Sequence, residues 1–232
     1  MFHVKRIGKE KMIKAVLFDY NGTLFADDDI NDMAWKATIE ELSQGKIDAD
    51  KFYGEFIGTR NYPFVEKMFE ILGMEHDEEK IMYWAKRKET KYYHEICRKL
   101  GRDKLMPGAE ELLDELKEKK IPFTMCTASL DVNVDFYFEQ LHLDRWFDKK
   151  TVVYDDGIMT DKKDMYLEGA KRQGVDIKDC LIFDDSPASI RNAALAGCEN
   201  IIVIKKPNNP DLPQIKQRIK DFTELDREVL KL

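Results

Sequence analysis

The sequence predicts an α/β fold in which a parallel, doubly wound sheet is joined to a small all-helical part. Two observations predict it. Five short apolar runs recur along the chain with helical patterns between most of them, and strands that alternate with helices are typical of parallel sheets. Between residues 27 and 100 the alternation fails, because that segment has helical period and no strand-like run.

The apolar runs are the candidate strands, since each is short and bounded by turn-forming or polar residues. The first run ends abruptly in Asp19, followed by the turn-forming pair Asn21-Gly22. The five runs occupy residues 13–18, 121–126, 151–153, 180–183 and 201–204.

Helical patterns fill the spaces between the later runs. Segment 107–119 opens with Pro-Gly and then carries three leucines on one face. Segments 164–173 and 187–196 each stop at a glycine, a common helix terminator. Residues 207–213 are rich in Pro and Asn, so we expect a loop there before a last polar helix.

Composition excludes several classes of protein. The 232 residues carry a net charge of −7, which gives no overall attraction to nucleic acid or to anionic membranes. No apolar run approaches the roughly 20 residues that span a bilayer, and residues 1–11 lack the apolar core of a signal peptide. The four cysteines have no metal-site spacing. We therefore expect free thiols and a cytoplasmic protein.

Polar side chains gather where the candidate strands end. Taken singly, each has a plain structural explanation, such as a helix cap or a solvated surface. In a parallel sheet, however, the carboxyl ends of all strands open at one edge, so these side chains are expected to converge. The residues concerned are Asp19, Thr127 and Ser129, the pair Lys162 and Lys163, and the pair Asp184 and Asp185.

Such a group suits phosphate chemistry. Three acidic side chains offer the oxygen ligands that Mg²⁺ prefers, and close like charges repel one another unless a cation is present. An amine, a hydroxyl and the N–H groups at helix starts can hold a phosphoryl group.

Four segments of the chain resemble the haloacid dehalogenase (HAD) superfamily of phosphohydrolases and phosphomutases. They are FDYNGTL at 18–24, CTAS at 126–129, a lysine just before YLEGAKRQGV at 166–175, and FDDSPASIRNAALAGC at 183–198. The helical insertion after the first motif fits the subgroup that includes phosphoglycolate phosphatase and β-phosphoglucomutase. The resemblance implies a HAD-like three-layer core at 1–25 and 106–232, with a helical cap at 26–105.

The resemblance also implies a role for each residue. Asp19 is the nucleophile that forms an aspartyl-phosphate. Mg²⁺ is held by the Asp19 carboxylate, the backbone carbonyl of Asn21 and Asp185, with Asp184 as a ligand or a neighbour of the ligands.

The phosphoryl group is bound by Thr127 and by the N–H groups of Tyr20 and Ala128, and a lysine neutralises charge. The usual lysine position of the family holds Thr160 here. We expect Lys162, with Lys163 close behind, to supply the charge instead.

Asn21 departs from the family, which normally has an acid–base Asp two residues after the nucleophile. An amide cannot exchange a proton near neutral pH, and losing such catalysis typically costs about 10²–10⁴-fold in rate. Three explanations remain open: substrates with activated leaving groups such as acyl phosphates, a different reaction, or partial deamidation at Asn21-Gly22.

The cap is expected to choose the substrate. Arg60, in FIGTR at 56–60, resembles the cap arginine that grips a distal phosphate in β-phosphoglucomutase, or it is a surface side chain after a turn. Asn31 stands where the mutase has a hinge His, so mutase activity is not expected. Asp27, at the hinge, is expected to cap the following helix.

The sequence thus favours a Mg²⁺-dependent phosphohydrolase of small phosphorylated metabolites, monomeric or weakly dimeric. The alternatives are a binding or regulatory protein with little turnover, motivated by Asn21, and a phosphonatase or dehalogenase reaction on the same fold.

Overall fold

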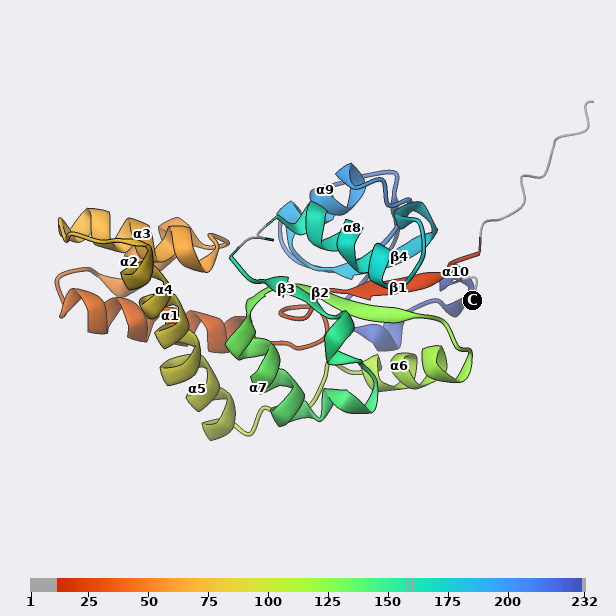
Figure 1. The fold of residues 1–232 in the computed structure, drawn as a ribbon, viewed down its shortest axis with the longest axis horizontal. Coiled ribbons are helices and arrows are strands. Elements are labelled where there is room, and N and C mark those ends of the chain that lie inside the picture. The colour runs from red at the N-terminus through yellow and green to blue at the C-terminus, as the bar shows by residue number, and fades with distance from the viewer. Residues whose placement is uncertain (1–11, 158, 160, 231–232) are drawn as a thin grey trace, which may run out of the picture.

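A sheet of six parallel strands runs through the molecule, with helices on both faces (Figure 1). The computed structural model describes residues 12–157, 159 and 161–230. The spatial order of the strands is β3-β2-β1-β4-β5-β6. Their bounds are β1 Ala15–Phe18, β2 Phe123–Leu130, β3 Val153–Asp155, β4 Cys180–Asp184, β5 Asn200–Ile204 and β6 Ile215–Ile219.

Strand β1 lies at the centre of the sheet, paired with β2 on one side and β4 on the other. The chain fills one half of the sheet with β2 and β3 and then crosses over to fill the other half. This reversal of strand order makes the carboxyl ends of β1 and β4 a topological switch point, where ligand sites form in open α/β sheets.

Helices cover both faces of the sheet because the side chains of β1 alternate. Ala15 and Leu17 pack in a cluster with α8 and α9, while Val16 and Phe18 pack in a cluster with α6 and α7. Figure 1 shows the two helix pairs on opposite sides of the sheet. Their bounds are α6 Ala109–Glu118, α7 Asp131–Leu141, α8 Lys162–Arg172 and α9 Pro187–Leu195.

The segment after β1 is helical and lies beside the sheet rather than on it (Figure 1). Trp35, Phe52, Phe64 and Met68 belong to an apolar cluster of these helices. The helices are α1 Asp28–Ser43, α2 Ala49–Phe56, α3 Asn61–Leu72, α4 Glu78–Arg87, the π-helical run η1 Lys88–Tyr93, and α5 His94–Lys99.

The predicted α/β fold is confirmed, with differences in several strands. The third strand, expected at 151–153, lies at Val153–Asp155 instead. The expected final loop and helix contain an additional strand, β6, at the sheet edge. Strand β2 also continues to Leu130, so CTAS lies within the strand. The short elements are η2 Leu143–Arg145, η3 Lys149–Thr151, η4 Ile177–Asp179, η5 Phe222–Glu224 and α10 Arg227–Leu230.

Two sequence-based expectations fall outside the described residues. They are the absence of a signal peptide at residues 1–11 and the substitution at Thr160. Among the described residues, no helix is both long enough and apolar enough to cross a membrane.

Helix α8 approaches the sheet closely at Gly169. A Cβ at this position would lie 2.4 Å from the Cys126 Sγ and 3.4 Å from a Leu17 methyl. Both neighbours are fully buried, so neither side chain can move aside easily. The absence of a side chain at residue 169 therefore sets the distance between α8 and strands β1 and β2.

We expect Gly169→Ala to lower the free energy of unfolding by about 1–3 kcal/mol through overpacking. Gly54→Ala, on the exposed surface of α2 with nothing within 4 Å, is the control, and should raise stability by about 0.5–1 kcal/mol through helix propensity. Urea unfolding of both variants tests this. A Gly169→Ala protein as stable as the parent would contradict the close contact.

Candidate active site

Asp19 is the first residue after β1 and stands at the switch point of the sheet. Its N–H donates to the Phe183 carbonyl at 2.9 Å, which continues the pairing of β1 with β4. The side chain is buried, and its Oδ1 accepts a hydrogen bond from the Lys162 Nζ at 2.7 Å. Asp19 therefore presents a carboxylate that is fixed in place by a buried ion pair.

Lys162 is the first residue of α8, which places its ammonium at the entrance of that helix. The Nζ also donates to the Cys126 carbonyl at 2.5 Å and lies 3.4 Å from Asp184 Oδ2. Burial alone would lower the pKa of Lys162, but the charges of Asp19 and Asp184 outweigh it and raise the pKa above its usual value. Lys162 therefore stays charged.

Strand β4 delivers two further carboxylates to the same place. Asp19, Asp184 and Asp185 each offer an oxygen, and these oxygens lie within 4.8 Å of one another. Asp184 accepts hydrogen bonds from the Tyr166 hydroxyl and, at 2.8 Å, from the Ser186 N–H. It is thus the more heavily bonded of the pair.

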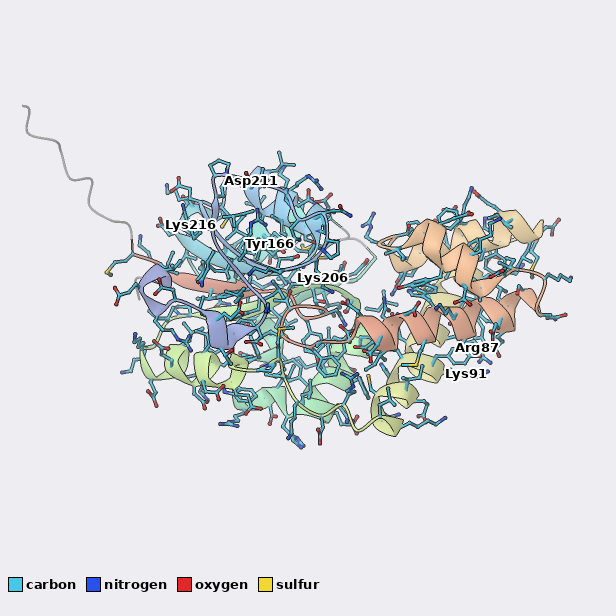
Figure 2. All side chains as sticks on the ribbon, turned by 180° about the vertical axis from the view of Figure 1, so that it is seen from behind. Arg87, Lys91, Tyr166, Lys206, Asp211 and Lys216 are labelled. Atoms are coloured by element: carbon cyan, nitrogen blue, oxygen red, sulfur yellow. The ribbon has the colours of Figure 1, made fainter. Side chains whose placement is uncertain are left out.

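Asp185 faces the loop after β1. Its Oδ1 accepts from the Thr23 hydroxyl at 3.2 Å, and its Oδ2 lies 3.4 Å from the Lys206 Nζ. A Cβ on Gly22 would lie 2.4 Å from Oδ2, and Gly22 has a φ of +72°. Glycine is therefore what lets this carboxylate approach the loop. Figure 2 labels Tyr166 within the sheet part and Lys206 at its side towards the helical part.

The three carboxylates form a donor set that fits a hard divalent cation. Burial, and then the charge of Asp19, raises the pKa of Asp184, while burial and the charges of Asp184 and Asp19 raise that of Asp185. The crowding therefore disfavours full ionisation. Oxygen-only ligands and unrelieved negative charge are what Mg²⁺ binding requires.

Strand β2 supplies the hydroxyl group. Thr127 Oγ1 donates to the Ser129 hydroxyl at 3.0 Å and accepts from the Ser129 N–H at 3.2 Å. Thr127 and Ala128 line the same cavity as Asp19 and Lys162. The cavity has a volume of about 580 Å³ and extends to side chains of the helical part, which is room for a small metabolite.

Asn21 is held at both ends of its amide. The nitrogen donates to Asp27 Oδ2 at 2.6 Å and to the Tyr137 hydroxyl at 3.0 Å, while the oxygen accepts from the Ser129 hydroxyl at 2.6 Å. A carboxylate only accepts, so Asp27 decides which way the amide faces. Asn21 is therefore a fixed, neutral member of a hydrogen-bond network.

Asp27 differs from its expected role. Its side chain makes no capping hydrogen bond to the described part of α1. Instead Oδ1 accepts from the Gly22 N–H at 3.0 Å and Oδ2 accepts from the Tyr93 hydroxyl at 2.6 Å. Burial raises its pKa to about 6, although the hydrogen bonds from Tyr93 and Asn21 oppose the shift. The carboxyl group of Asp27 thus belongs to the network around Asn21.

Three predicted residues remain: Lys163, Tyr20 and Arg60. Lys163 is exposed, and its N–H donates to the Asp161 cap of α8 at 2.8 Å, so Lys162 alone of the pair reaches Asp19. The ring of Tyr20 is fully buried and stacks on the ring of Tyr137, with 3.8 Å between the ring centres. Arg60 is exposed at the cavity rim.

Sequence reasoning also missed residues of the network around Asn21 and a partner of the Asp185 backbone. Tyr93 and Tyr137 come from helices far along the chain and had no motif to mark them. Asn209 lies in the loop after β5 and also had no motif; its side chain donates to the Asp185 carbonyl at 2.7 Å. Asp27 had a signal, since it lies in a run of three aspartates at the hinge.

Known proteins resemble this chain over most of its length. The family model of haloacid dehalogenase-like hydrolases matches residues 13–197. A probable pseudouridine-5'-phosphatase of Drosophila melanogaster is 28% identical over 193 residues, covering 81% of this chain and 80% of that protein. The 6-phosphogluconate phosphatase of Escherichia coli (strain K12) is 25% identical over 219 residues, covering 93% and 92%.

A solved structure shares the fold closely. A HAD hydrolase, family IA, variant 3, from Entamoeba histolytica superposes with a TM-score of 0.81 at 29% identity, covering 94% of this chain and 97% of that one.

The contact between Asn21 and Asp27 predicts that the two residues can be exchanged only together. Asn21→Asp places two carboxylates in contact. Asp27→Asn brings an amide N–H towards groups that are themselves donors, such as the Asn21 amide nitrogen. We expect each single change to lower the free energy of unfolding by about 1–3 kcal/mol. The double variant Asn21→Asp/Asp27→Asn reverses the polarity of the pair and should recover to within about 1 kcal/mol.

A double-mutant cycle by urea unfolding measures the coupling. Asp103→Asn, at an exposed loop position, is the control for loss of one negative charge. Purely additive effects of the two changes would rule out the pairing.

Proposed function

The chain belongs to the haloacid dehalogenase-like hydrolases, and from this membership we propose that it is a Mg²⁺-dependent phosphohydrolase of small phosphorylated metabolites in the cytoplasm. Its named relatives include phosphatases, which supports the choice of phosphate esters and anhydrides as substrates. The observation that carries the proposal is the Asp19 carboxylate, which lines the cavity 2.7 Å from Lys162 and lies beside the carboxylates of Asp184 and Asp185.

In the proposed reaction a carboxylate oxygen of Asp19 attacks phosphorus. The new O–P bond forms as the bond to the leaving oxygen breaks, which yields an aspartyl-phosphate and the leaving group as an oxyanion, and this oxyanion takes its proton from solvent water. Water then attacks the phosphoenzyme, which releases phosphate and restores Asp19. Lys162 offsets the negative charge where nucleophile and phosphate meet. Thr127 and the backbone N–H groups of Tyr20 and Ala128 would hold the phosphoryl oxygens.

Magnesium would be bound by Asp19, Asp185 and the Asn21 carbonyl, with Asp184 beside them. When bound, it supplies positive charge for the transferring phosphoryl group. Asp184 is held by Tyr166 and the Ser186 N–H, so it supports the position of its neighbour. Gly22 keeps the loop clear for Asp185.

Asn21 shapes which leaving groups depart readily. Its amide is engaged at both ends and has no proton to give near neutral pH. Substrates whose leaving oxygen needs little protonation therefore suit this site best. Residues 26–105 would act as the cap that closes over the leaving group and selects it.

The two adjacent lysines provide a matched test of the ion pair. We expect Asp19→Asn to abolish phosphate release, and Lys162→Met to lower kcat/KM by about 10²–10³-fold, as for loss of one electrostatic donor. Lys163→Met, one residue away on the exposed surface, should leave it nearly unchanged.

Phosphate release from p-nitrophenyl phosphate and acetyl phosphate in Mg²⁺ buffer gives the rates. Turnover that survives Asp19→Asn would refute the nucleophile. Equal losses in the two lysine variants would refute the role of Lys162.

Metal binding can be tested without turnover. A ligand that binds only the folded protein stabilises it by about 2.7 kcal/mol at 100 times its Kd, so Mg²⁺ should raise the melting temperature. Asp185→Asn should abolish the rise, whereas Asp164→Asn, an exposed control on α8, should keep it. A rise that persists in Asp185→Asn would place the metal elsewhere.

A further inference from the structure

One wall of the cavity mixes aromatic rings with neutral amides. Trp35 and Phe64 provide rings, and Asn31 and Asn61 provide amides, all from helices α1 and α3. Rings and amides together are typical of sites for uncharged polar ligands. These four residues come from the helical part of the chain, whereas Asp19 and Lys162, which line the same cavity, come from the sheet part.

Two adjacent charged residues, Lys88 and Glu89, also line this wall. Lys88 Nζ lies 3.0 Å from Glu89 Oε1, and the side chains are only 3% and 2% exposed. The ammonium also donates to Asn31 Oδ1 at 2.5 Å and lies 5.0 Å from the centre of the Trp35 ring. The pair is therefore buried, positioned by the cap and neutral as a unit.

Glu89 has one oxygen that lacks a donor. Oε1 accepts hydrogen bonds from the Lys88 ammonium and, at 2.8 Å, from the side-chain N–H of Asn61. Oε2 is buried and has no hydrogen-bond partner among the described residues. An unmet buried acceptor on a carboxylate is costly, and cavity walls are where a ligand can meet such a group.

The local backbone departs from the regular helix at this place. Lys88 and Glu89 open the π-helical run η1, which joins α4 to α5. Single π-helical turns inside helices are rare and occur frequently at functional sites. The irregular turn is thus the part of the cap that carries the buried pair.

We propose that Glu89 selects the leaving group of the substrate by accepting a hydrogen bond from one of its hydroxyls. The substrate is then a monophosphate whose leaving group bears hydroxyls and carries no charge of its own. The inference rests on the proposed function, because it assigns the substrate class of the same cavity. A hydroxyl donates to Oε2, while the neighbouring amides and Lys88 satisfy the other hydroxyls.

The same carboxylate disfavours a second phosphate in this position. Lys88 is already paired with Glu89, so the wall offers no excess positive charge to an anion. Arg60, the alternative phosphate ligand, is exposed; burial raises the pKa of Asp155, and the nearby charge of Arg60 opposes that rise. Its charge is thus shared with a carboxyl group.

Binding to matched probes tests the proposal. Glucosyl phosphate and cyclohexyl phosphate share a six-membered ring and differ in hydroxyls, and glucose bisphosphate adds a second anion. Calorimetry is done in Mg²⁺ buffer on the Asp19→Asn protein, with and without Glu89→Gln. We expect Glu89→Gln to weaken glucosyl phosphate by about 10–100-fold, as for a lost hydrogen bond to a charged group.

Cyclohexyl phosphate should bind almost equally to both proteins, and the bisphosphate should bind better after Glu89→Gln. Glu66→Gln, on the exposed surface of α3, is the control and should change nothing. Equal effects of Glu89→Gln on the glucosyl and cyclohexyl probes would overturn the proposal, as would no effect on either.

A second variant distinguishes a lost hydrogen bond from misfolding of the cap. Lys88→Met/Glu89→Gln removes both buried charges, and it should keep the melting temperature while losing the preference for the hydroxylated probe. Because binding is measured without turnover, the two proposals fail separately. A parent protein that hydrolyses nothing refutes the phosphohydrolase, whereas a preference insensitive to residue 89 refutes this inference.

Discussion

The ion pair between Lys162 and Asp19 is the contact on which the candidate site depends. Three buried carboxylates meet at the ends of β1 and β4, and such a group cannot stay ionised without nearby positive charge. Lys162 supplies one charge from the start of α8, and a divalent cation would supply more. The topology makes this possible, because the reversal of strand order brings β1, β4 and the start of α8 together.

The neutral amide of Asn21 fits the same constraint. A carboxylate at residue 21 would touch Asp27 and add a further charge to a site that already holds three. With Asn the network is satisfied: Ser129 donates to the amide oxygen and Asp27 accepts from the nitrogen. The substitution that looks like a loss in the sequence is therefore, in the structure, one half of a matched pair.

Much of the core could be predicted from the sequence, because its signals are local. A buried strand that ends in a carboxylate is visible as an apolar run followed by Asp, as at Asp19 and Asp184. Strand β6 was missed because three consecutive polar residues separate its two isoleucines, so it has neither an apolar run nor an alternating pattern. The role of Asp27 was predicted wrongly, as a helix cap, and that of Glu89 was not predicted, since both roles depend on partners far along the chain, such as Tyr93, 66 positions from Asp27. Glu89 also lies among many Lys and Glu, a pattern that normally indicates a solvated helix face.

Cys126 contacts both the closely packed helix α8, through its thiol, and the candidate site, through its backbone carbonyl. Its thiol lies where a side chain on Gly169 would be, and its carbonyl accepts from the Lys162 ammonium at 2.5 Å. A bulkier group at either residue would lift α8 and carry Lys162 away from Asp19. Evolution can therefore enlarge one of these residues only by keeping the other small, so positions 126 and 169 should vary together among relatives although neither contacts the substrate.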